Sequence, residues 1–242
     1  MVNGIAMPAG ETLVDLRGVT KDYHGLRPLR VARLELHAGE SMALLGFDRL
    51  TAELLVNLIT GAVLPDAGEV HAMGQRTADI LDADAWIGTL DQFGLISERA
   101  ILLDQLTVEQ NLTVPLSLEI DDPPADVRTR ISRLAEEVGI DAADLRKPVA
   151  AIAPAARLRL RLGRALALDP RVLLAEHPNA LVPPGDVAPF AADLARIVAA
   201  RGMASLVITA DQTFARAVAE HVLTLQPATG ELKRASGWRR WL

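Results

Sequence analysis

The chain has 242 residues, half of them hydrophobic, and its formal net charge is −6. Because no basic excess offsets phosphate repulsion, this balance argues against nucleic acid as a partner. The absence of cysteine excludes disulfides and thiolate metal sites. No apolar run approaches the roughly 20 residues that span a bilayer, and the N-terminus lacks the pattern of a signal peptide. We therefore expect a soluble protein of the cytosol.

Short apolar segments between turn residues predict strands, and longer periodic segments predict helices. Strands are expected at 13–16, 29–36, 41–45, from Val70, and at 86–90, 171–175 and 204–209. Helical spacing is found at 54–61, 127–138, 155–168 and 190–200. Strands that alternate with helices indicate an α/β fold with a mainly parallel sheet.

The pattern also divides the chain into segments. Residues 1–10 are expected to be a flexible tail, and 11–230 a single domain with a helical subdomain inserted at about 97–166. Residues 231–242 form a basic and aromatic C-terminal tail that includes Trp238 and Trp241. Two tryptophans beside two arginines suit a membrane interface or a groove on a partner. The alternative is a short disordered end.

The segment that follows the apolar strand 41–45 has the setting of a phosphate-binding loop, with a helical segment after it. In the motif G-x-x-x-x-G-K-[ST], backbone amides and the lysine hold nucleotide phosphates. Counted from Gly46, the second glycine falls at Thr51, the lysine at Ala52 and the Mg²⁺-binding hydroxyl at Glu53. The motif therefore keeps its place in the chain but not its working side chains.

With this loop, the order of segments resembles the ATP-binding subunit of ABC transporters over nearly the whole chain. The matching stretches are 18–23, 38–46, 57–61, 65–70, Gln92, 106–116 and 164–170. The resemblance implies a P-loop NTPase-like, mainly parallel sheet with an N-terminal antiparallel β portion and a helical subdomain insertion. Residues 106–116 are most similar to the lipid and lipoprotein exporter branch.

The resemblance also assigns roles to single residues. Tyr23 takes the place of the aromatic residue that stacks on adenine, and Gln92 that of the Q-loop glutamine beside the helical insertion. Glu176 aligns with the Walker B aspartate, His177 with the catalytic glutamate and Ala210 with the switch histidine. ATP and Mg²⁺ are the implied cofactors.

These positions define a vestigial nucleotide site, whose members are Tyr23, Gly46, Arg49, Thr51, Ala52, Glu53, Leu54, Gln92 and Glu176. Ala52 supplies no cation, and Glu53 brings a carboxylate to the position of the phosphates. At about 4 Å and an effective dielectric constant near 20, each like-charge pair costs about 4 kcal/mol. We expect ATP and Mg²⁺ to be held weakly or not at all. The segment that aligns with the LSGGQ signature, 152–156, keeps no glycine or hydroxyl.

Several of these residues have two interpretations. Glu53 is interpreted as an internal stand-in for phosphate that caps its own helix. Arg49 either replaces the lost lysine or is a surface residue paired with Asp48 or Glu53. His177 is either a general base or a polar residue at a strand end. Tyr23 either stacks on adenine or covers the sheet edge.

The predicted function is that of a structural or regulatory subunit of an ABC transport complex, with weak or no ATP hydrolysis. The expected partners are a membrane permease, contacted beside Gln92, and a second subunit in a homodimer or a heterodimer with a related ATPase. The chain would then lie on the inner face of the membrane. Two alternatives are an active ATPase with a non-standard site and a soluble module that binds another small molecule.

Overall fold

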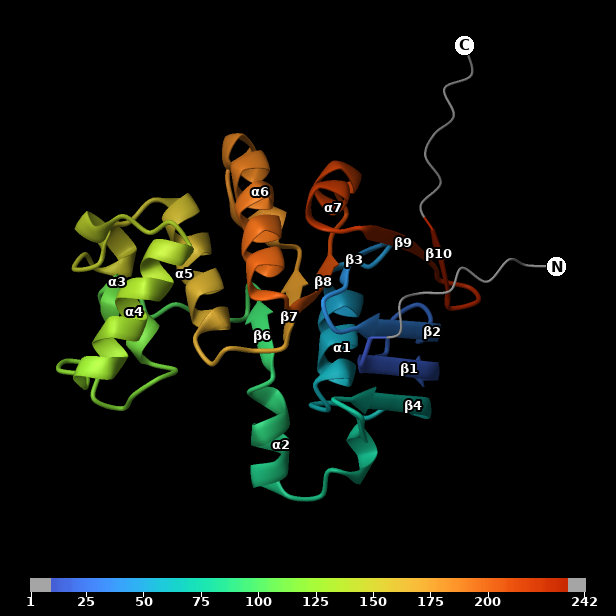
Figure 1. The fold of residues 1–242 in the computed structure, drawn as a ribbon. Coiled ribbons are helices and arrows are strands. Elements are labelled where there is room, and N and C mark those ends of the chain that lie inside the picture. The colour runs from blue at the N-terminus through green and yellow to red at the C-terminus, as the bar shows by residue number, and fades with distance from the viewer. Residues whose placement is uncertain (1–9, 235–242) are drawn as a thin grey trace, which may run out of the picture.

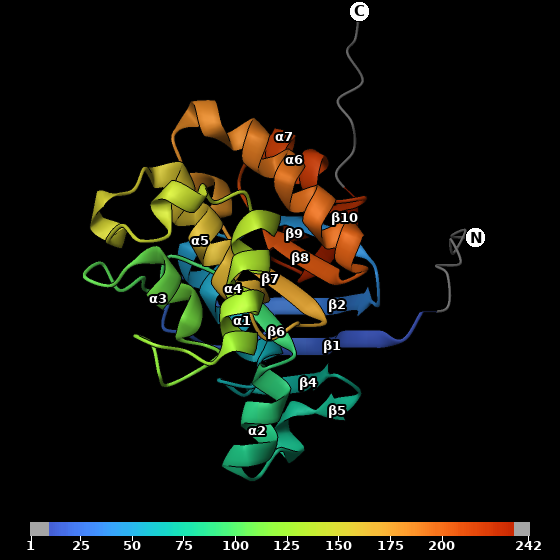
Figure 2. The same ribbon diagram turned by 60° about the vertical axis from the view of Figure 1, so that its left-hand side comes forward.

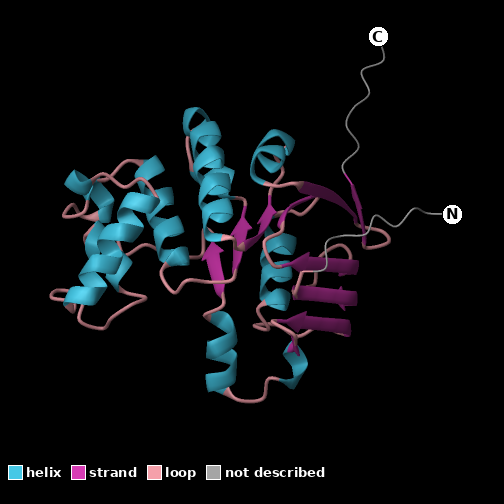
Figure 3. Cartoon of the chain, viewed as in Figure 1, coloured by secondary structure: helices cyan, strands magenta, loops and turns pink. Residues whose placement is uncertain are grey.

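The strands form two sheets in the computed structural model, which describes residues 10–234 (Figures 1 and 3). The antiparallel sheet has the order β2-β1-β4-β5 and comprises β1 (Thr12–Lys21), β2 (Leu29–His37), β4 (Ala67–Ala72) and β5 (Gln75–Arg76). The second has the order β10-β9-β3-β8-β7-β6 and comprises β3 (Ser41–Leu45), β6 (Phe93–Ile96), β7 (Val172–Glu176), β8 (Ala204–Ile208), β9 (His221–Gln226) and β10 (Glu231–Arg234). Its pairs are parallel except β9–β10.

Seven α-helices flank these sheets within the described residues (Figures 1 and 2). They are α1 (Arg49–Ile59), α2 (Ala83–Leu90), α3 (Val108–Thr113), α4 (Ala125–Glu137), α5 (Pro154–Leu166), α6 (Pro184–Arg201) and α7 (Gln212–Val218). Short 3₁₀ turns lie at Thr77–Asp79, Ala142–Asp144, Val149–Ala151 and Pro178–Leu181. The predicted α/β class is confirmed.

The mainly parallel sheet is buried on both faces, which explains its continuous apolar strands. Successive side chains point to opposite faces. On β8, Leu206 and Ile208 belong to the core that includes α1 and the antiparallel sheet, while Val207 belongs to the core beneath α5, α6 and α7. The carboxyl ends of β3, β7 and β8 therefore meet at one edge, where α1 begins.

The helices α3, α4 and α5 lie between β6 and β7 in the sequence and form a group at one side of the molecule (Figure 1). A capping box starts α3, because Thr107 accepts from the Gln110 amide while the Gln110 side chain accepts from the Thr107 amide. Gly163 lets α5 approach α3 closely, since a Cβ at this position would lie 2.8 Å from a methyl group of Leu112 in α3. This group occupies the place of the predicted helical subdomain.

One expectation about secondary structure was wrong. Residues 86–90 were expected to form a strand but belong to α2, whose N-cap Asp82 accepts from the Ala85 amide. A five-residue apolar run does not distinguish strand from helix, and the cap decides for the helix. The missed strand β6 follows at once and pairs with β7.

The predicted domain end at residue 230 was also too early, because 231–234 form β10 and pair with β9. The expected N-terminal tail, apart from Gly10, and both Trp238 and Trp241 lie outside the described residues.

Candidate functional site

The connection from β3 to α1 is short and is closed by the chain itself. Gly46 has a φ of +86°, and a Cβ there would lie 3.2 Å from the Leu225 carbonyl oxygen, so glycine is required. Helix α1 starts only three residues later, at Arg49. Asp48 is its N-cap and accepts from the Thr51 amide at 2.8 Å and from the Thr51 hydroxyl at 2.7 Å.

This cap corrects the interpretation of Glu53. The carboxylate that receives first-turn amides of α1 is that of Asp48, whereas Glu53 lies one turn further on, 3.5 Å from Arg99. The hydrogen bond from the Thr51 amide lowers the pKa of Asp48, and the Thr51 hydroxyl lowers it further. Asp48 therefore stays ionised and fills the place at a helix N-terminus that a phosphate would favour.

The other predicted loop residues point in different directions. Ala52 is fully buried against the core, and Leu54 is buried as well. The Arg49 side chain is 72% exposed and pairs with Glu98 at 2.6 Å, and neither Asp48 nor Glu53 is its partner. Arg49 is thus a surface residue held by an ion pair.

Glu176 ends β7 and is one of the few buried carboxylates, with 9% of its side chain exposed. Burial raises its pKa, and the opposing effect of Arg99 is smaller. An Arg99 Nη2 to Glu176 Oε1 contact of 2.5 Å supplies the charge partner, and Arg99 Nη1 lies 3.3 Å from Asn57 Oδ1. Arg99 thus joins α1 to the end of β7.

His177 and Ala210 lie at the same edge of the sheet without a catalytic arrangement. His177 has a φ of +45°, its amide donates to the Ile208 carbonyl, and its Nε2 is buried with no hydrogen-bond partner among residues 10–234. Ala210 is exposed directly after β8, where the neighbouring Thr209 hydroxyl donates to Asn179 at 2.8 Å. Neither position presents a paired base.

Gln92 lies at the opposite end of the sheet. It precedes β6, and its carbonyl accepts from the amides of Arg171 and Val172, where β7 begins. Because β6 and β7 are parallel, Gln92 is separated from Glu176 by the length of the strand. The structure therefore does not bring Gln92 to the other members of the vestigial site. The residues that follow β6, and reach that site, are Ser97, Glu98 and Arg99.

Tyr23 does lie beside Gly46 and Thr51. All three line a cavity of about 360 Å³, together with Asp48, Arg27 of the β1–β2 connection and Arg30 of β2. Apolar walls come from Leu29, Leu225 and Pro227. The cavity has an aromatic wall and basic groups near its mouth, while a carboxylate stands at the start of α1.

A second cavity, of about 200 Å³, is here called the Arg161 groove. It lies beside β6 and α5, which pack against each other, and is lined by Phe93, Leu95, Leu102, Pro115, Arg161 and Arg164. Burial lowers the pKa of both arginines. Repulsion from Arg157 lowers that of Arg161 further, and repulsion from Arg161 lowers that of Arg164 further. Within residues 10–234, neither forms an ion pair, although Arg164 donates to the Ile101 carbonyl at 2.7 Å. The groove thus combines apolar walls with two half-buried cations.

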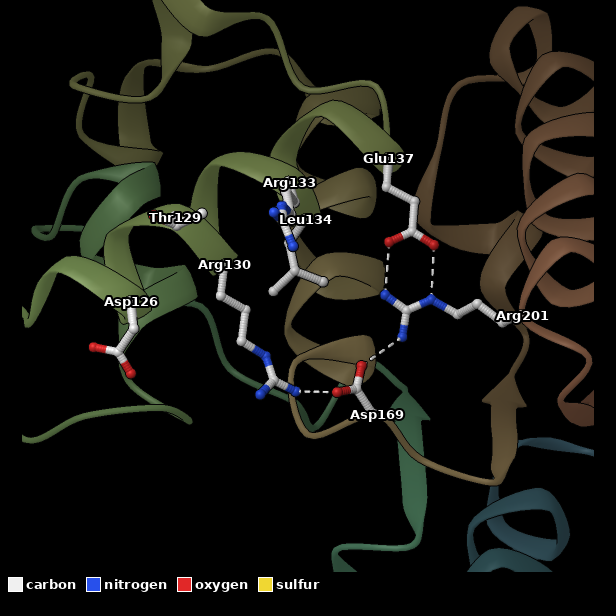
Figure 4. Close-up of a pocket in the computed structure, with 8 residues that line it drawn as sticks. All are labelled: Asp126, Thr129, Arg130, Arg133, Leu134, Glu137, Asp169 and Arg201. Carbon is white, nitrogen blue, oxygen red and sulfur yellow. Dashed lines mark hydrogen bonds and ion pairs between the residues drawn. The ribbon is translucent and has the colours of Figure 1, made fainter.

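A third cavity, of about 650 Å³, lies where α4 meets the turn before β7 and the end of α6 (Figure 4). Arg201 binds both carboxylate oxygens of Glu137, at 2.6 and 2.7 Å, and lies 3.2 Å from Asp169. Arg130 completes the network on the other oxygen of Asp169. Because these charges pair with one another, the network anchors the helical group to the sheet.

Sequence reasoning missed Asp48 and Arg99 as members of the site. For Asp48 a signal existed, since an acidic residue just before a helical run is a frequent N-cap. Arg99 offered none, because its main partner is 77 residues away in the chain. Among the described residues, no group of three or more His, Asp or Glu side chains is arranged to hold a metal ion.

Fold and site together define a phosphate-loop type of α/β protein with a helical insertion. Residues 29–180 match the family model described as ABC transporter. This match covers more than half of the 242 residues, and the chain belongs to the ABC transporter family as an ATP-binding subunit type.

Three relatives show the range of similarity. The chain is 26% identical over 213 residues to the methionine import ATP-binding protein MetN of Brucella abortus (strain 2308), covering 88% of this chain and 57% of that protein. It is 30% identical over 204 residues to the phosphonates import ATP-binding protein PhnC of Anaeromyxobacter dehalogenans, covering 80% and 40%. It is 33% identical over 162 residues to the sulfate/thiosulfate import ATP-binding protein CysA of Gloeobacter violaceus, covering 66% and 44%.

The chain therefore spans about half the length of these relatives. All three are named for import, so they lend no support to the exporter branch, which stays a prediction.

Solved structures agree on the fold. The dimeric bacterial ABC transporter cassette MJ0796 superposes with a TM-score of 0.76 at 22% identity, covering 93% of this chain and 100% of that one. The cbiO1 protein of Clostridium perfringens gives a TM-score of 0.78 at 16% identity, covering 92% and 87%. In the part of the chain that the structure describes, none of the helices has the length and apolar character to cross a bilayer.

Proposed function

We propose that this chain is a structural or regulatory subunit of an ABC transport complex, with weak or no ATP hydrolysis. The observation that carries the proposal is the Asp48 carboxylate on the first turn of α1, where a nucleotide would place its phosphates. An anion already occupies these amides, so a triphosphate would have to displace it and would meet its charge.

The donor set supports the same conclusion for Mg·ATP. A phosphate nest needs successive amides turned inward by positive φ angles, and of residues 46–54 only Gly46 has one. Ala52 offers no cation, and it is buried, so nothing at that position reaches outward. Glu53 and Glu176 add carboxylates, and both are near Arg99. The residues present do not fit a Mg-bound triphosphate.

The Arg161 groove supports the partner side of the proposal. An apolar groove with unpaired, half-buried cations is costly to leave open, because burial disfavours their charge. A cytoplasmic segment of a permease that fills the groove would cover its walls and supply hydrogen-bond acceptors. The permease would then contact the Arg161 groove and not the Gln92 side chain. The chain would then lie on the inner face of the membrane as part of a dimer.

One second candidate has an observation in its favour. The cavity of about 360 Å³ beside Tyr23 carries an aromatic ring and two arginines, and the relatives are named ATP-binding proteins. An active ATPase would use this cavity in a non-standard way, with the phosphates away from α1. Arg27 and Arg30 would then have to replace the loop lysine.

Equilibrium dialysis with labelled ATP, with and without Mg²⁺, separates the two candidates. We expect a dissociation constant weaker than about 1 mM, which corresponds to less than about 4 kcal/mol of binding, and no Mg-dependent phosphate release. Tight binding or turnover that is lost on Arg27→Ala would establish the second candidate instead.

Affinity purification from solubilised membranes tests the partner. An integral membrane protein should accompany the wild-type chain and the control variant Arg216→Glu, which alters an exposed residue of α7 away from the groove. It should be absent with Arg161→Glu, which reverses charge inside the groove. Equal recovery with both variants would remove the groove from the proposal.

A further inference from the structure

The guanidinium of Arg99 lies between two carboxylates that come from different elements. Its Nη2 is 2.5 Å from Oε1 of Glu176, at the end of β7, and its Nη1 is 3.5 Å from Oε1 of Glu53, in α1. The same Nη1 donates to Asn57 Oδ1 at 3.3 Å. The Arg99 guanidinium therefore faces three oxygen atoms, from Glu176, Glu53 and Asn57, at the carboxyl edge of the sheet.

The positions of these donors are informative. Glu53 stands where the phosphate-loop motif has its Mg²⁺-binding hydroxyl, and Glu176 where the resemblance places the Walker B carboxylate. Oxygen donors of this kind are those that Mg²⁺ prefers. In this chain, the space between them is taken by a side chain with a fixed positive charge and several N–H donors.

Burial explains why a cation is needed there. Glu176 is 9% exposed, and a buried carboxylate without a partner is unfavourable. Arg99 is 34% exposed, so its charged end also reaches solvent while it contacts Glu176. Arginine thereby satisfies the carboxylate without any ligand from outside.

Arg99 also belongs to a segment that reaches the Arg161 groove. Its neighbour Glu98 pairs with Arg49 of α1 at 2.6 Å, and the next residues, Ala100 and Leu102, line the groove. Arg164 of α5 donates to the Ile101 carbonyl. Residues 97–102 are therefore fixed to α1 and β7 on one side and to α5 on the other.

We propose that Arg99 is a built-in cation that occupies the divalent-metal position between Glu53 and Glu176, and that it holds residues 97–102 against the groove without metal or nucleotide. Two consequences follow. The wild-type chain has no divalent-cation site at this edge, and loss of Arg99 exposes one. The groove wall keeps one conformation regardless of ATP. The inference builds on the proposed loss of Mg·ATP binding, but its test uses the metal alone.

The test measures Mn²⁺ uptake by the full chain with electron paramagnetic resonance, in the absence of nucleotide. Wild type should take up no Mn²⁺ that depends on Glu176. Arg99→Gln should bind Mn²⁺ at least about tenfold more tightly than wild type, since a full positive charge has left two carboxylates. The double variant Arg99→Gln with Glu176→Gln should return to the wild-type level. The matched control is Arg49→Gln, which removes a nearby arginine that pairs with Glu98 and not with Glu53 or Glu176. This variant should not gain Mn²⁺ binding.

Amide hydrogen exchange tests the second part on the same proteins. Exchange across residues 97–102 should accelerate at least about tenfold in Arg99→Gln and much less in Arg99→Lys, which keeps the charge. Circular dichroism confirms that each variant is folded.

The proposal is overturned if wild type binds Mn²⁺ as tightly as Arg99→Gln in a manner that Glu176→Gln abolishes. It is equally overturned if folded Arg99→Gln gains no Mn²⁺, or if exchange at 97–102 is unchanged. None of these results depends on whether the chain associates with a permease, so the two proposals fail separately.

Discussion

Charged side chains around the start of α1 pair with other side chains and amides of the same chain, whereas the two arginines of the Arg161 groove form no ion pair within residues 10–234. Asp48 receives the Thr51 amide, and Arg99 contacts both Glu53 and Glu176. In the groove, Arg161 is half-buried and only the more distant Glu98 and Asp104 favour its charge. In the first region, neighbouring residues balance the charges, and for the groove we propose that a partner does so.

This difference bears on which of the two regions binds a partner in the proposed function. A region whose anion and cation positions are filled by its own residues has little to gain from a nucleotide or a metal ion. A groove with apolar walls and unpaired cations gains from a partner that covers it. The same fold thus places a closed site and an open surface at opposite sides of residues 97–102. The following variants either break this contrast or sharpen it.

The largest effect on stability is expected from Arg99→Ala. It leaves Glu176 buried without a charge partner, and because Arg99 is partly exposed we expect a loss of about 2 kcal/mol in the free energy of unfolding. Glu176→Gln is the control and should change that free energy by less than about 1 kcal/mol, since Arg99 reaches solvent. Urea unfolding followed by circular dichroism measures both. If both variants lost the same free energy of unfolding, the Arg99–Glu176 ion pair, and not the unpaired buried charge of Glu176, would account for the loss.

Partner association should respond next. Arg161→Glu is expected to weaken association with the membrane partner at least about tenfold, or about 1.4 kcal/mol, because a buried repulsion replaces an available cation. The stability of the isolated chain should fall little, since Arg161 has no ion pair within residues 10–234. Arg216→Glu is the control for net charge. Association that tracks net charge alone would contradict a specific groove.

The cap on α1 gives a smaller, pH-dependent effect. Asp48→Ala should cost about 1 kcal/mol at neutral pH, the usual value of an N-cap. The pKa of Asp48 is below its ordinary value of 3.8 in the folded chain, so its stabilising contribution is full above that value and is lost as the pH falls through the folded pKa. The difference between wild type and variant should therefore shrink in acid below about pH 4. A difference that does not shrink at all as the pH is lowered below about 4 would rule out the carboxylate as its source.

The smallest effect is expected at Arg49. Its ion pair with Glu98 is exposed on both sides, and such pairs contribute about 0.5 kcal/mol or less. Arg49→Ala should leave the unfolding midpoint almost unchanged, and high salt should remove any remaining difference. A loss comparable to that of Arg99→Ala would mean that Arg49 holds residues 97–102 as firmly as Arg99 does.

Much of the fold was predictable from local pattern. The strand at 41–45 and the strands near 171–175 and 204–209 were found because continuous apolar runs between turn residues mark buried parallel strands. The strand predicted at 86–90 is a helix, since a short apolar run suits either state and the Asp82 cap favours the helix. The strand β10 was missed because three of its four residues are charged, and the strand is stabilised by pairing with β9.

The candidate site divides in the same way. The losses at Thr51, Ala52 and Glu53 are visible in the sequence, because the motif has fixed spacing. Tyr23 and Gly46 line one cavity, and a nucleotide role for them stays a prediction. Gln92 lies apart from them, because the strand expected at 86–90 is helix α2 and the actual strand, β6, begins only after Gln92. A shift of a few residues along one strand moves a side chain from one edge of the sheet to the other.

The sequence by itself determined the α/β architecture and the side chains at the phosphate-loop positions, because both are encoded in residues close together along the chain. Only the tertiary structure decided what replaced that chemistry. Arg99 meets Glu53 and Glu176 across 46 and 77 residues, and Arg161 faces a groove built from distant strands and helices. Charge pairing and burial act through space, so their outcome depends on how the folded elements pack and not on the order of residues along the chain.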